Sequence, residues 1–344
     1  MTSADLMARF ADRTGVTGAS PQRRYLWTDA FAVCNFLALG RIDVALALID
    51  RVHHVLGRHR ADDPRDGWIS GLPEADGEAH PTIGGLRIGK PLPERGPGQP
   101  LDEEREWDRD GQYFHYLTKW MHALDQTARA TGNRTLAMWA RELAVSAHRR
   151  FAYGALGARR MYWKMSVDLM RPQVSSMGHH DPLDGYVTCR QLDAHEPDLA
   201  RAADDFHAMI EPSALATSDP LGIGGLLVDA SRLAQLDRDS ALRTSILAAA
   251  RIGLAHYVQQ PDLRRPAEQR LAFRELGLAI GLAAFESDPA FAQFSRIRAS
   301  ITAFWSDVSH RQSRLYRDHE DINDVMLATA LAPSGFTALH RSAA

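Results

Sequence analysis

Carboxylates and histidines gather in a few short segments of the sequence, and these segments fall where helices are expected to begin. Grouped carboxyl groups suit general acid-base chemistry, because burial and mutual repulsion raise the pKa of at least one of them and let it hold a proton. We expect Asp110 and Asp184 to be the acid and base, and Asp108 and Asp181 are the next candidates. The full set of acidic candidates is Asp29, Asp108, Asp110, Asp181, Asp184 and Asp321.

Histidines offer a second kind of chemistry at the same places. His179 and His180 directly precede Asp181, and His319 opens the segment His-Glu-Asp. Histidine gains and loses a proton near neutral pH, so paired histidines are able to abstract a proton from a substrate and return it. His180 and His319 are therefore the alternative pair of catalytic groups.

Aromatic and polar side chains beside these positions are candidates for contact with a flat, partly apolar ligand. Core packing is about as good an interpretation for each of them taken singly. His115 is included because it falls two residues after Tyr113. The predicted substrate-binding residues are Trp27, Asp29, Trp107, Tyr113, His115, Trp163, His179, Tyr186, Asp321 and Asn323.

No cofactor and no required metal are expected. His179, His180, Asp181 and Asp184 are ligand types, but adjacent side chains rarely reach one metal ion, and no HExxH pattern is present. The glycines from Gly84 to Gly89 lack the spacing of a phosphate-binding loop. We expect instead a mobile loop whose cations, Arg87 and Lys90, bind an anionic group of the substrate. Cys34 and Cys189 are the only cysteines, which excludes a disulfide framework, and both are expected to be inert core thiols.

The composition excludes several classes of protein. Forty Lys and Arg against 43 Asp and Glu give a formal charge of −3 over 344 residues, and no basic stripe suggests a nucleic-acid partner. The purest apolar run, 276–285, is far shorter than the roughly 18 to 20 residues of a membrane-spanning helix. The first twenty residues hold no continuous hydrophobic stretch. A cytoplasmic protein without membrane contact is therefore expected.

Apolar residues recur at spacings of three and four, while alternating strand patterns are nearly absent. The chain is predicted to be all-α and to form one domain over 1–344. A twelfth helix is expected in the opening residues or in 309–317. Eleven helices are predicted at 22–39, 41–58, 109–131, 134–152, 184–195, 198–210, 221–236, 239–258, 266–285, 289–306 and 320–331.

Two long connections, 59–108 and 153–183, precede helices that open with acidic residues. Structureless connections of this length in a compact domain are usually lids or binding loops, so both are expected to lie over a cavity. Polar and aromatic clusters open every second helix, whereas the intervening helices are rich in Ala, Leu and Arg. Asp219, followed by Pro220, is interpreted as a helix cap.

About six helical hairpins with polar clusters at one end of alternate helices resemble the (α/α)6 toroid superfamily, which includes glycoside hydrolases, polysaccharide lyases and N-acylglucosamine 2-epimerases. The resemblance covers about 20–335 and implies parallel inner helices whose starts form a funnel for a sugar. Paired carboxyl groups cleave glycosidic bonds, so a glycoside hydrolase using Asp110 and Asp184 in a locally acidic cavity is the leading hypothesis.

Three alternatives stay open. The first is a cofactor-independent sugar epimerase or isomerase that uses His180 and His319. The second is a lyase or cyclase that acts on a less polar substrate. The third is a helical binding scaffold without enzymatic activity.

Overall fold

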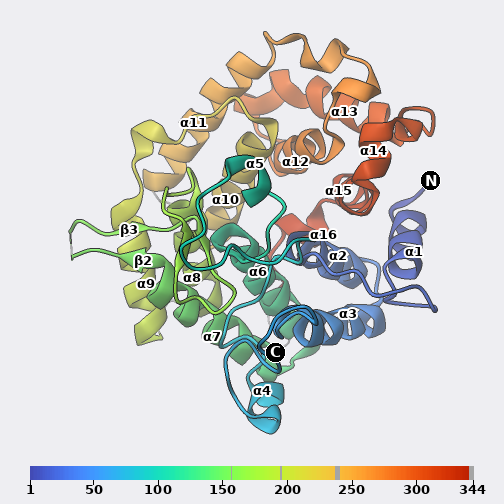
Figure 1. The fold of residues 1–344 in the computed structure, drawn as a ribbon. Coiled ribbons are helices and arrows are strands. Elements are labelled where there is room, and N and C mark those ends of the chain that lie inside the picture. The colour runs from blue at the N-terminus through green and yellow to red at the C-terminus, as the bar shows by residue number, and fades with distance from the viewer. Residues whose placement is uncertain (156, 194–195, 237–240, 341–344) are drawn as a thin grey trace. The chain divides into compact units, whose positions relative to one another are not determined.

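The structure is a computed structural model that describes residues 1–155, 157–193, 196–236 and 241–340 (Figure 1). The chain forms two compact units. The first comprises Met1–Ser20, Cys34–Arg41 and Glu211–Leu339, and the second comprises Pro21–Val33, Ile42–Ile210 and also His340. Helix α2 (Leu26–Ala38) contributes to both. Each unit is described by itself.

The second unit is built around α6 (Phe114–Thr131), which is buried along most of its length. Helix α6 packs against α7 (Arg134–Phe151) and α8 (Asp181–Asp193), and α8 packs against α9 (Pro197–Met209). The remaining helices are α3 (Ile42–Leu56), α4 (Glu74–Ala79) and α5 (Glu103–Glu106). Alternate helices, α6 and α8, thus contact each other, as an arrangement of inner and outer helices requires.

The first unit repeats this alternation. Helix α12 (Ala272–Ala283) packs against α10 (Pro220–Leu236) and α15 (Glu320–Leu331), while α11 (Ala241–Tyr257) and α13 (Ser295–Ser306) pack outside them. The close approach of α10 to α12 needs glycine, because a Cβ atom on Gly224 would lie 2.2 Å from the carbonyl oxygen of Gly277. The short helices of this unit are α1 (Ser3–Arg13), α14 (Arg314–Asp318) and α16 (Ser334–Thr337), with 3-10 turns at Pro212–Ala214, Pro261–Arg264, Ala267–Gln269, Pro289–Phe294 and His310–Gln312.

All eleven predicted helices are present, and both places named for a twelfth hold helical residues, α1 and α14. Several boundaries differ for local reasons. Helix α6 begins at Phe114 rather than 109, because Gly111 has a φ of 144° and Gln112–Tyr113 pair as a strand. Helix α12 begins at Ala272, after the 3-10 turn that follows Pro266. The predicted end at 194–195 and start at 239–240 lie outside the described residues.

Within the described residues, strands are few and only two or three residues long, in agreement with the near absence of strand patterns in the sequence. Strands β1 (Gln112–Tyr113), β4 (Lys164–Met165) and β5 (Pro172–Val174) form an antiparallel sheet in the order β1-β4-β5. Strand β2 (Ala152–Tyr153) pairs with β3 (Arg160–Met161). Elements of two or three residues are too short to display an alternating pattern in the sequence.

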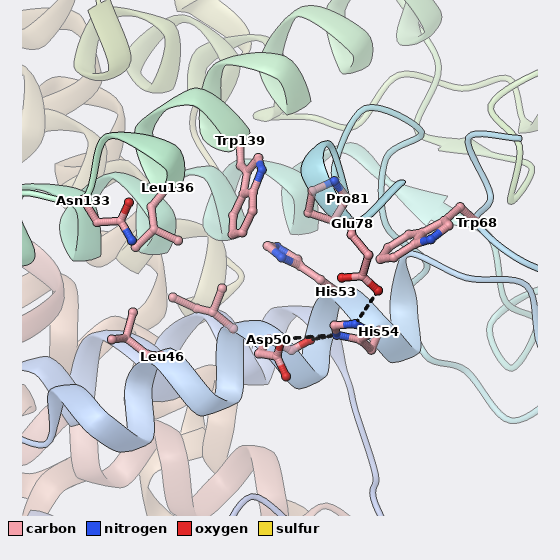
Figure 2. A pocket seen from close by; sticks show the side chains of 11 residues that line it. Leu46, Asp50, His53, His54, Trp68, Glu78, Pro81, Asn133, Leu136 and Trp139 are labelled. Atoms are coloured by element: carbon pink, nitrogen blue, oxygen red, sulfur yellow. Dashed lines mark hydrogen bonds and ion pairs between the residues drawn. The ribbon is translucent and has the colours of Figure 1, made fainter. Parts of the chain in front are cut away.

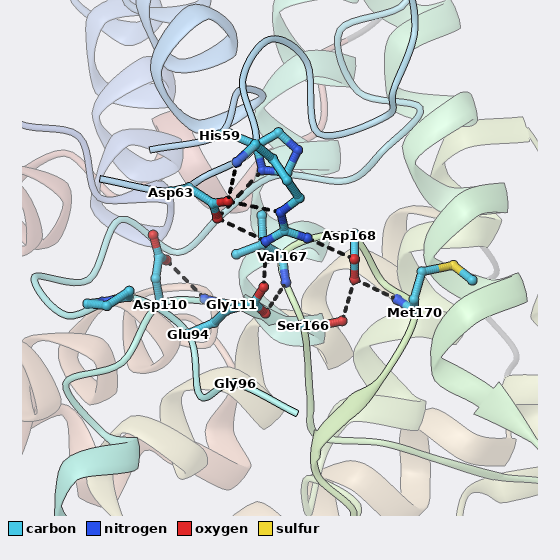
Figure 3. A network of polar contacts seen from close by, with 12 residues as sticks. His59, Asp63, Glu94, Gly96, Asp110, Gly111, Ser166, Val167, Asp168 and Met170 are labelled. Carbon is cyan, nitrogen blue, oxygen red and sulfur yellow. Dashed lines mark hydrogen bonds and ion pairs between the residues drawn. The ribbon is translucent and has the colours of Figure 1, made fainter. Parts of the chain in front are cut away.

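The two long connections are tied to each other rather than structureless. Arg65 donates to Asp168 (Nη1 to Oδ2, 2.9 Å) and to Glu94 (Nη2 to Oε1, 2.8 Å), and Glu94 in turn accepts from the backbone N–H of Val167 (2.8 Å) (Figure 3). Arg95 donates to the carbonyl of Gln173 (2.6 Å). These contacts cross-link 59–108 and 153–183 into one layer of loops.

None of the helices in the described part of the chain is both long and apolar enough to cross a membrane.

Candidate functional site

The starts of three alternate helices meet in the second unit. Tyr25, just before α2, and Tyr116, in the first turn of α6, have hydroxyl oxygens 2.6 Å apart. His115, also in the first turn of α6, lies with Nδ1 3.6 Å from Oδ1 of Asp181, the first residue of α8. We call this group, completed by Tyr113 and Trp163, the α6 rim site.

Aromatic rings surround His115. Its ring is stacked near Tyr113 (centroids 5.3 Å apart, planes at 25°) and parallel to Trp163 (6.3 Å, 12°), and Tyr116 meets it edge-on (4.9 Å, 85°). Trp107 adds an exposed ring against Trp163, with centroids 5.2 Å apart. Flat faces of this kind suit the apolar side of a small polar ligand.

Polar atoms of the His115–Asp181 pair are left without hydrogen bonds. In the described part of the chain, Nδ1 of His115 and Oδ2 of Asp181 are buried and have no hydrogen-bond partner. The Asp181 side chain is only 8% exposed, and a separation of 3.6 Å is longer than a hydrogen bond. Buried polar atoms normally have partners, so an unsatisfied pair beside an aromatic wall marks a place for a ligand or a water.

Gly178 sets the position of the Asp181 carboxylate. A Cβ atom on residue 178 would lie 2.3 Å from Oδ2 of Asp181, which is closer than any non-bonded contact allows. Any larger residue at 178 would have to displace the carboxylate.

Asp110 is completely buried and has the contacts of a structural anchor. It accepts from Arg87 (Nη1 to Oδ2, 2.6 Å) and from the backbone N–H groups of Gly89 (3.0 Å) and Gly111 (3.1 Å). Arg87 also donates to the carbonyl of Arg58 (2.7 Å). The contacts of Arg87 do not support the expectation that it binds an anionic group of the substrate, because this arginine is buried and holds the loop to Asp110.

Asp184, the predicted partner of Asp110, is buried in α8. It accepts from the hydroxyl of Thr118 (2.5 Å) and from Nζ of Lys119 (2.6 Å), both on α6. These two contacts tie α8 to α6 through the Asp184 carboxylate. The contacts of Asp110 and Asp184 therefore favour structural roles, and their assignment as acid and base stays a prediction.

The other predicted residues of the second unit have mixed surroundings. Asp29 is buried and accepts from the backbone N–H of Tyr25 (3.0 Å) and from Arg24 (3.3 Å). Trp27 is buried against Phe31 (4.5 Å between centroids). Their contacts are those of helix capping and core packing.

Residues nearer the surface are less constrained. Asp108 is exposed, and His179 is exposed with its ring 4.5 Å from that of His180. Tyr186 is partly buried beside His207, with centroids 5.0 Å apart.

Three predicted residues lie in the first unit. His319 is exposed, with its ring 6.1 Å from Phe273, and Asp321 pairs with Arg13 (2.6 Å). Asn323 is buried; its Oδ1 accepts from the backbone N–H of Phe273 (3.0 Å) and its Nδ2 donates to the carbonyl of Tyr316 (3.0 Å). His180 and His319, the alternative catalytic pair, thus belong to different units.

Sequence reasoning missed Tyr25, Tyr116 and Lys164. Tyr25 opens the first of the clusters at helix starts, and Tyr116 directly follows the candidate His115, so their phenol groups were a usable signal. Lys164 is fully buried, and its Nζ donates to the carbonyl of Glu106 (2.8 Å), to Oε1 of Glu106 (2.9 Å) and to the carbonyl of Arg109 (2.8 Å). Burial lowers the pKa of Lys164, and Glu106 opposes that shift.

Charge and protonation at the rim follow from burial. Burial, helped by Tyr25 and Glu106, raises the pKa of Tyr113, so its hydroxyl stays protonated. Burial also raises the pKa of the Cys34 and Cys189 thiols to about 12, as expected for inert core cysteines.

Among the described residues, no three His, Cys, Asp or Glu side chains are grouped so that they could hold a metal ion.

Comparison with known proteins finds likeness in structure only. No family model matches the chain, and no curated protein matches it. Among solved structures, a GH76 α-mannanase from Bacteroides thetaiotaomicron superposes with a TM-score of 0.59 at 11% identity, covering 96% of this chain and 94% of that one. A D-mannose isomerase gives 0.56 at 12% identity, covering 96% and 95%. The cellobiose 2-epimerase of Spirochaeta thermophila gives 0.53 at 13% identity, covering 95% and 97%.

The chain has the fold of the (α/α)6 toroid superfamily. The predicted all-α fold class and the resemblance stated from the sequence are both confirmed. The TM-scores of 0.53 to 0.59 establish the fold. Because the identities are only 11% to 13%, the chemistry has to be argued from this chain's own residues.

Proposed function

We propose that the chain is a sugar-processing enzyme, and that it isomerises or epimerises its substrate by proton transfer at the α6 rim site. The observation that carries the proposal is the His115–Asp181 pair, whose buried polar atoms lack partners beside stacked aromatic rings. Support for a sugar comes from structural neighbours named as a mannanase, a mannose isomerase and sugar epimerases.

His115 is the group that moves the proton. An ionised Asp181 favours a hydrogen on Nδ1 of His115, which leaves Nε2 able to accept one. Nε2 then takes the hydrogen from the carbon next to the carbonyl group of an open-chain sugar, and the C–H electron pair forms an enediolate. Return of the proton to the former carbonyl carbon, together with transfer of the hydroxyl hydrogen of the neighbouring carbon to the former carbonyl oxygen, gives an isomer. Return to the opposite face of the first carbon gives an epimer and needs a second acid, for which His180 is the sequence-based candidate.

The tyrosines stabilise the charge that develops. The adjoining phenol groups of Tyr25 and Tyr116 are assigned to donate a hydrogen bond to the enediolate oxygen. Tyr113 and Trp163 supply flat faces for the C–H side of the sugar. Asp181 is a positioning residue in this scheme, since it acts through His115.

Deuterated water tests the proposal. The chain is incubated with D-mannose, D-glucose, D-fructose and cellobiose, and carbon-bound deuterium is measured by NMR. We expect incorporation with the unmodified chain and its loss in His115→Asn and Asp181→Asn. His256→Asn, an exposed histidine of α11, is the matched control and should keep the full rate. Incorporation that persists in His115→Asn would refute the assignment.

Glycoside hydrolysis is the second candidate, and the unpartnered Oδ2 of Asp181 is the observation in its favour. A buried carboxyl group near aromatic rings is suited to hold a proton for a leaving oxygen. Under this hypothesis the second carboxylate is Asp110 or Asp184. Hydrolysis of mannan or cellobiose with new reducing ends and without carbon-bound deuterium would favour it over proton transfer at carbon.

A further inference from the structure

A cavity of about 180 Å³ lies in the second unit between α3, α4 and α7, and none of its lining residues belongs to the α6 rim site (Figure 2). Two of its lining residues are aromatic, Trp68 and Trp139, and Leu46 lies at one end. The lining also includes polar side chains, among them Asp50, His53 and Glu78. At roughly 30 Å³ for each water, the volume holds about six waters or one small ring in their place.

The walls of this cavity are preorganised. The guanidinium group of Arg58 lies 4.3 Å from the ring centre of Trp68, and a Cβ atom on Gly77 would lie 2.2 Å from Cδ1 of that ring. The indole N–H of Trp139 donates to the carbonyl of Ala79 (2.7 Å). The ring of Trp68 is thus held in place by Arg58 and Gly77, and Trp139 offers a fixed aromatic face that a ligand does not have to order.

His53 offers the cavity a hydrogen-bond donor. It accepts from the indole N–H of Trp120 at Nε2 (3.2 Å), and burial lowers its pKa to about 3, so the ring is neutral and its hydrogen is on Nδ1. Within the described ranges that Nδ1 makes no hydrogen bond, although the side chain is 2% exposed and lines the cavity. A donor that faces a cavity without an acceptor is suited to a ligand or water.

The charged groups around the cavity compensate one another. His54 has oxygen acceptors at both ring nitrogens, Glu78 at Nε2 (2.9 Å) and the carbonyl of Asp50 at Nδ1 (2.9 Å). Burial opposes a charge, but these two contacts raise the pKa of His54 and favour the imidazolium. Arg58 also approaches Glu78 (3.4 Å). An ionic ligand thus finds no single uncompensated charge here, whereas hydroxyl groups find both a donor and carboxylate acceptors.

We propose that this cavity is a second, non-catalytic binding site for one uncharged sugar ring. The C–H face of the ring packs on Trp139, a hydroxyl oxygen accepts from Nδ1 of His53, and other hydroxyls donate to Asp50 and Glu78. The argument uses only the shape and polarity of the cavity, so it does not depend on the chemistry at His115.

Indole ¹⁵N labelling tests the proposal on the whole chain, because the seven tryptophans report on separate places. The probes are methyl α-D-mannoside, methyl β-D-glucoside and methyl β-D-galactoside, which have no free carbonyl group to react. Trp139→Phe assigns its own signal. We expect at least one probe to shift the Trp68 and Trp139 signals with saturable binding. Shifts at Trp107 and Trp163 report separately on the α6 rim site.

Leu46→Trp fills the mouth of the cavity, and Leu331→Trp is its matched control, since the two leucines are 38% and 37% exposed on helices. We expect the first variant to weaken binding at Trp68 and Trp139 roughly tenfold or more and the second to leave it unchanged. Three results would overturn the proposal: no probe shifts these two signals, Leu46→Trp binds as the unmodified chain does, or choline shifts the signals while no sugar does.

Discussion

Polar residues stand at helix starts in both units, at α2, α6 and α8 in the second and at α10, α12 and α15 in the first. The two groups differ in the hydrogen bonds that these residues make. In the first unit Asp219 caps α10 through the N–H of Gly222 (2.9 Å) and pairs with Arg274 of α12 (2.6 Å). Asn323 of α15 joins the backbones of Phe273 and Tyr316. In the second unit, His115 and Asp181 face each other with unsatisfied buried atoms.

The comparison teaches that polarity at a helix start does not by itself mark chemistry. Helix starts attract carboxylates and amides because their N–H groups lack partners, and capping accounts for Asp219 fully. What separates the α6 rim site is a His–Asp pair with an unsatisfied buried atom on each member, set among aromatic rings. We therefore expect substitutions at paired residues to lower stability and substitutions at the unsatisfied pair to lower turnover.

The largest effect is expected from Asp110→Asn, which breaks the ion pair with buried Arg87. Leaving that cation without its partner should cost about 3–5 kcal/mol of unfolding free energy, measured by urea denaturation. Turnover per folded molecule should persist. Intact stability with abolished turnover would instead make Asp110 the catalytic carboxylate that the sequence suggested.

Gly178→Ala should act on turnover rather than stability. The added methyl group has to displace the Asp181 carboxylate, and a shift of about 1 Å at a catalytic group costs on the order of 100-fold in rate. Deuterium incorporation measures the rate, and thermal unfolding serves as the control. An unchanged rate would mean that Asp181 does not position His115.

Asn323→Ala tests the opposite side of the comparison. The variant loses two buried hydrogen bonds in the first unit, so the unfolding free energy should fall by about 2 kcal/mol. Deuterium incorporation per folded molecule should not change. A selective loss of deuterium incorporation would indicate that the α15 start takes part in the reaction. It would contradict the proposed difference between the first unit and the α6 rim site.

The smallest effect concerns pH. Burial lowers the pKa of His53 to about 3, so the unfolded chain binds a proton below pH 6.5 that the folded chain does not. This contribution to stability is complete above pH 6.5 and decreases as the pH falls toward 3. Between pH 7 and 5.5 it should amount to about 1 kcal/mol, seen as a steeper pH dependence of unfolding free energy in the unmodified chain than in His53→Asn. Parallel curves would contradict it.

The sequence predicts the helices well, because apolar periodicity over ten or more residues is a strong signal, as in α3 and α7. It predicts the segments of the candidate site but not the roles within them. Asp110 and Asp184 look like a catalytic pair until Arg87 and Lys119 are placed beside them, and those partners lie 23 and 65 residues away in the chain. The short strands and the contacts of Arg65 are likewise decided by tertiary packing.

A crystal structure with the sugar alcohol D-mannitol tests the central claim most directly, because mannitol has the carbon chain of an open sugar and no carbonyl group to react. Our account predicts that mannitol lies against Tyr113 and Trp163 with a carbon about 3–3.5 Å from Nε2 of His115 and a hydroxyl group on Asp181. Mannitol bound at Arg274 and His319, with His115 and Asp181 untouched, would contradict it.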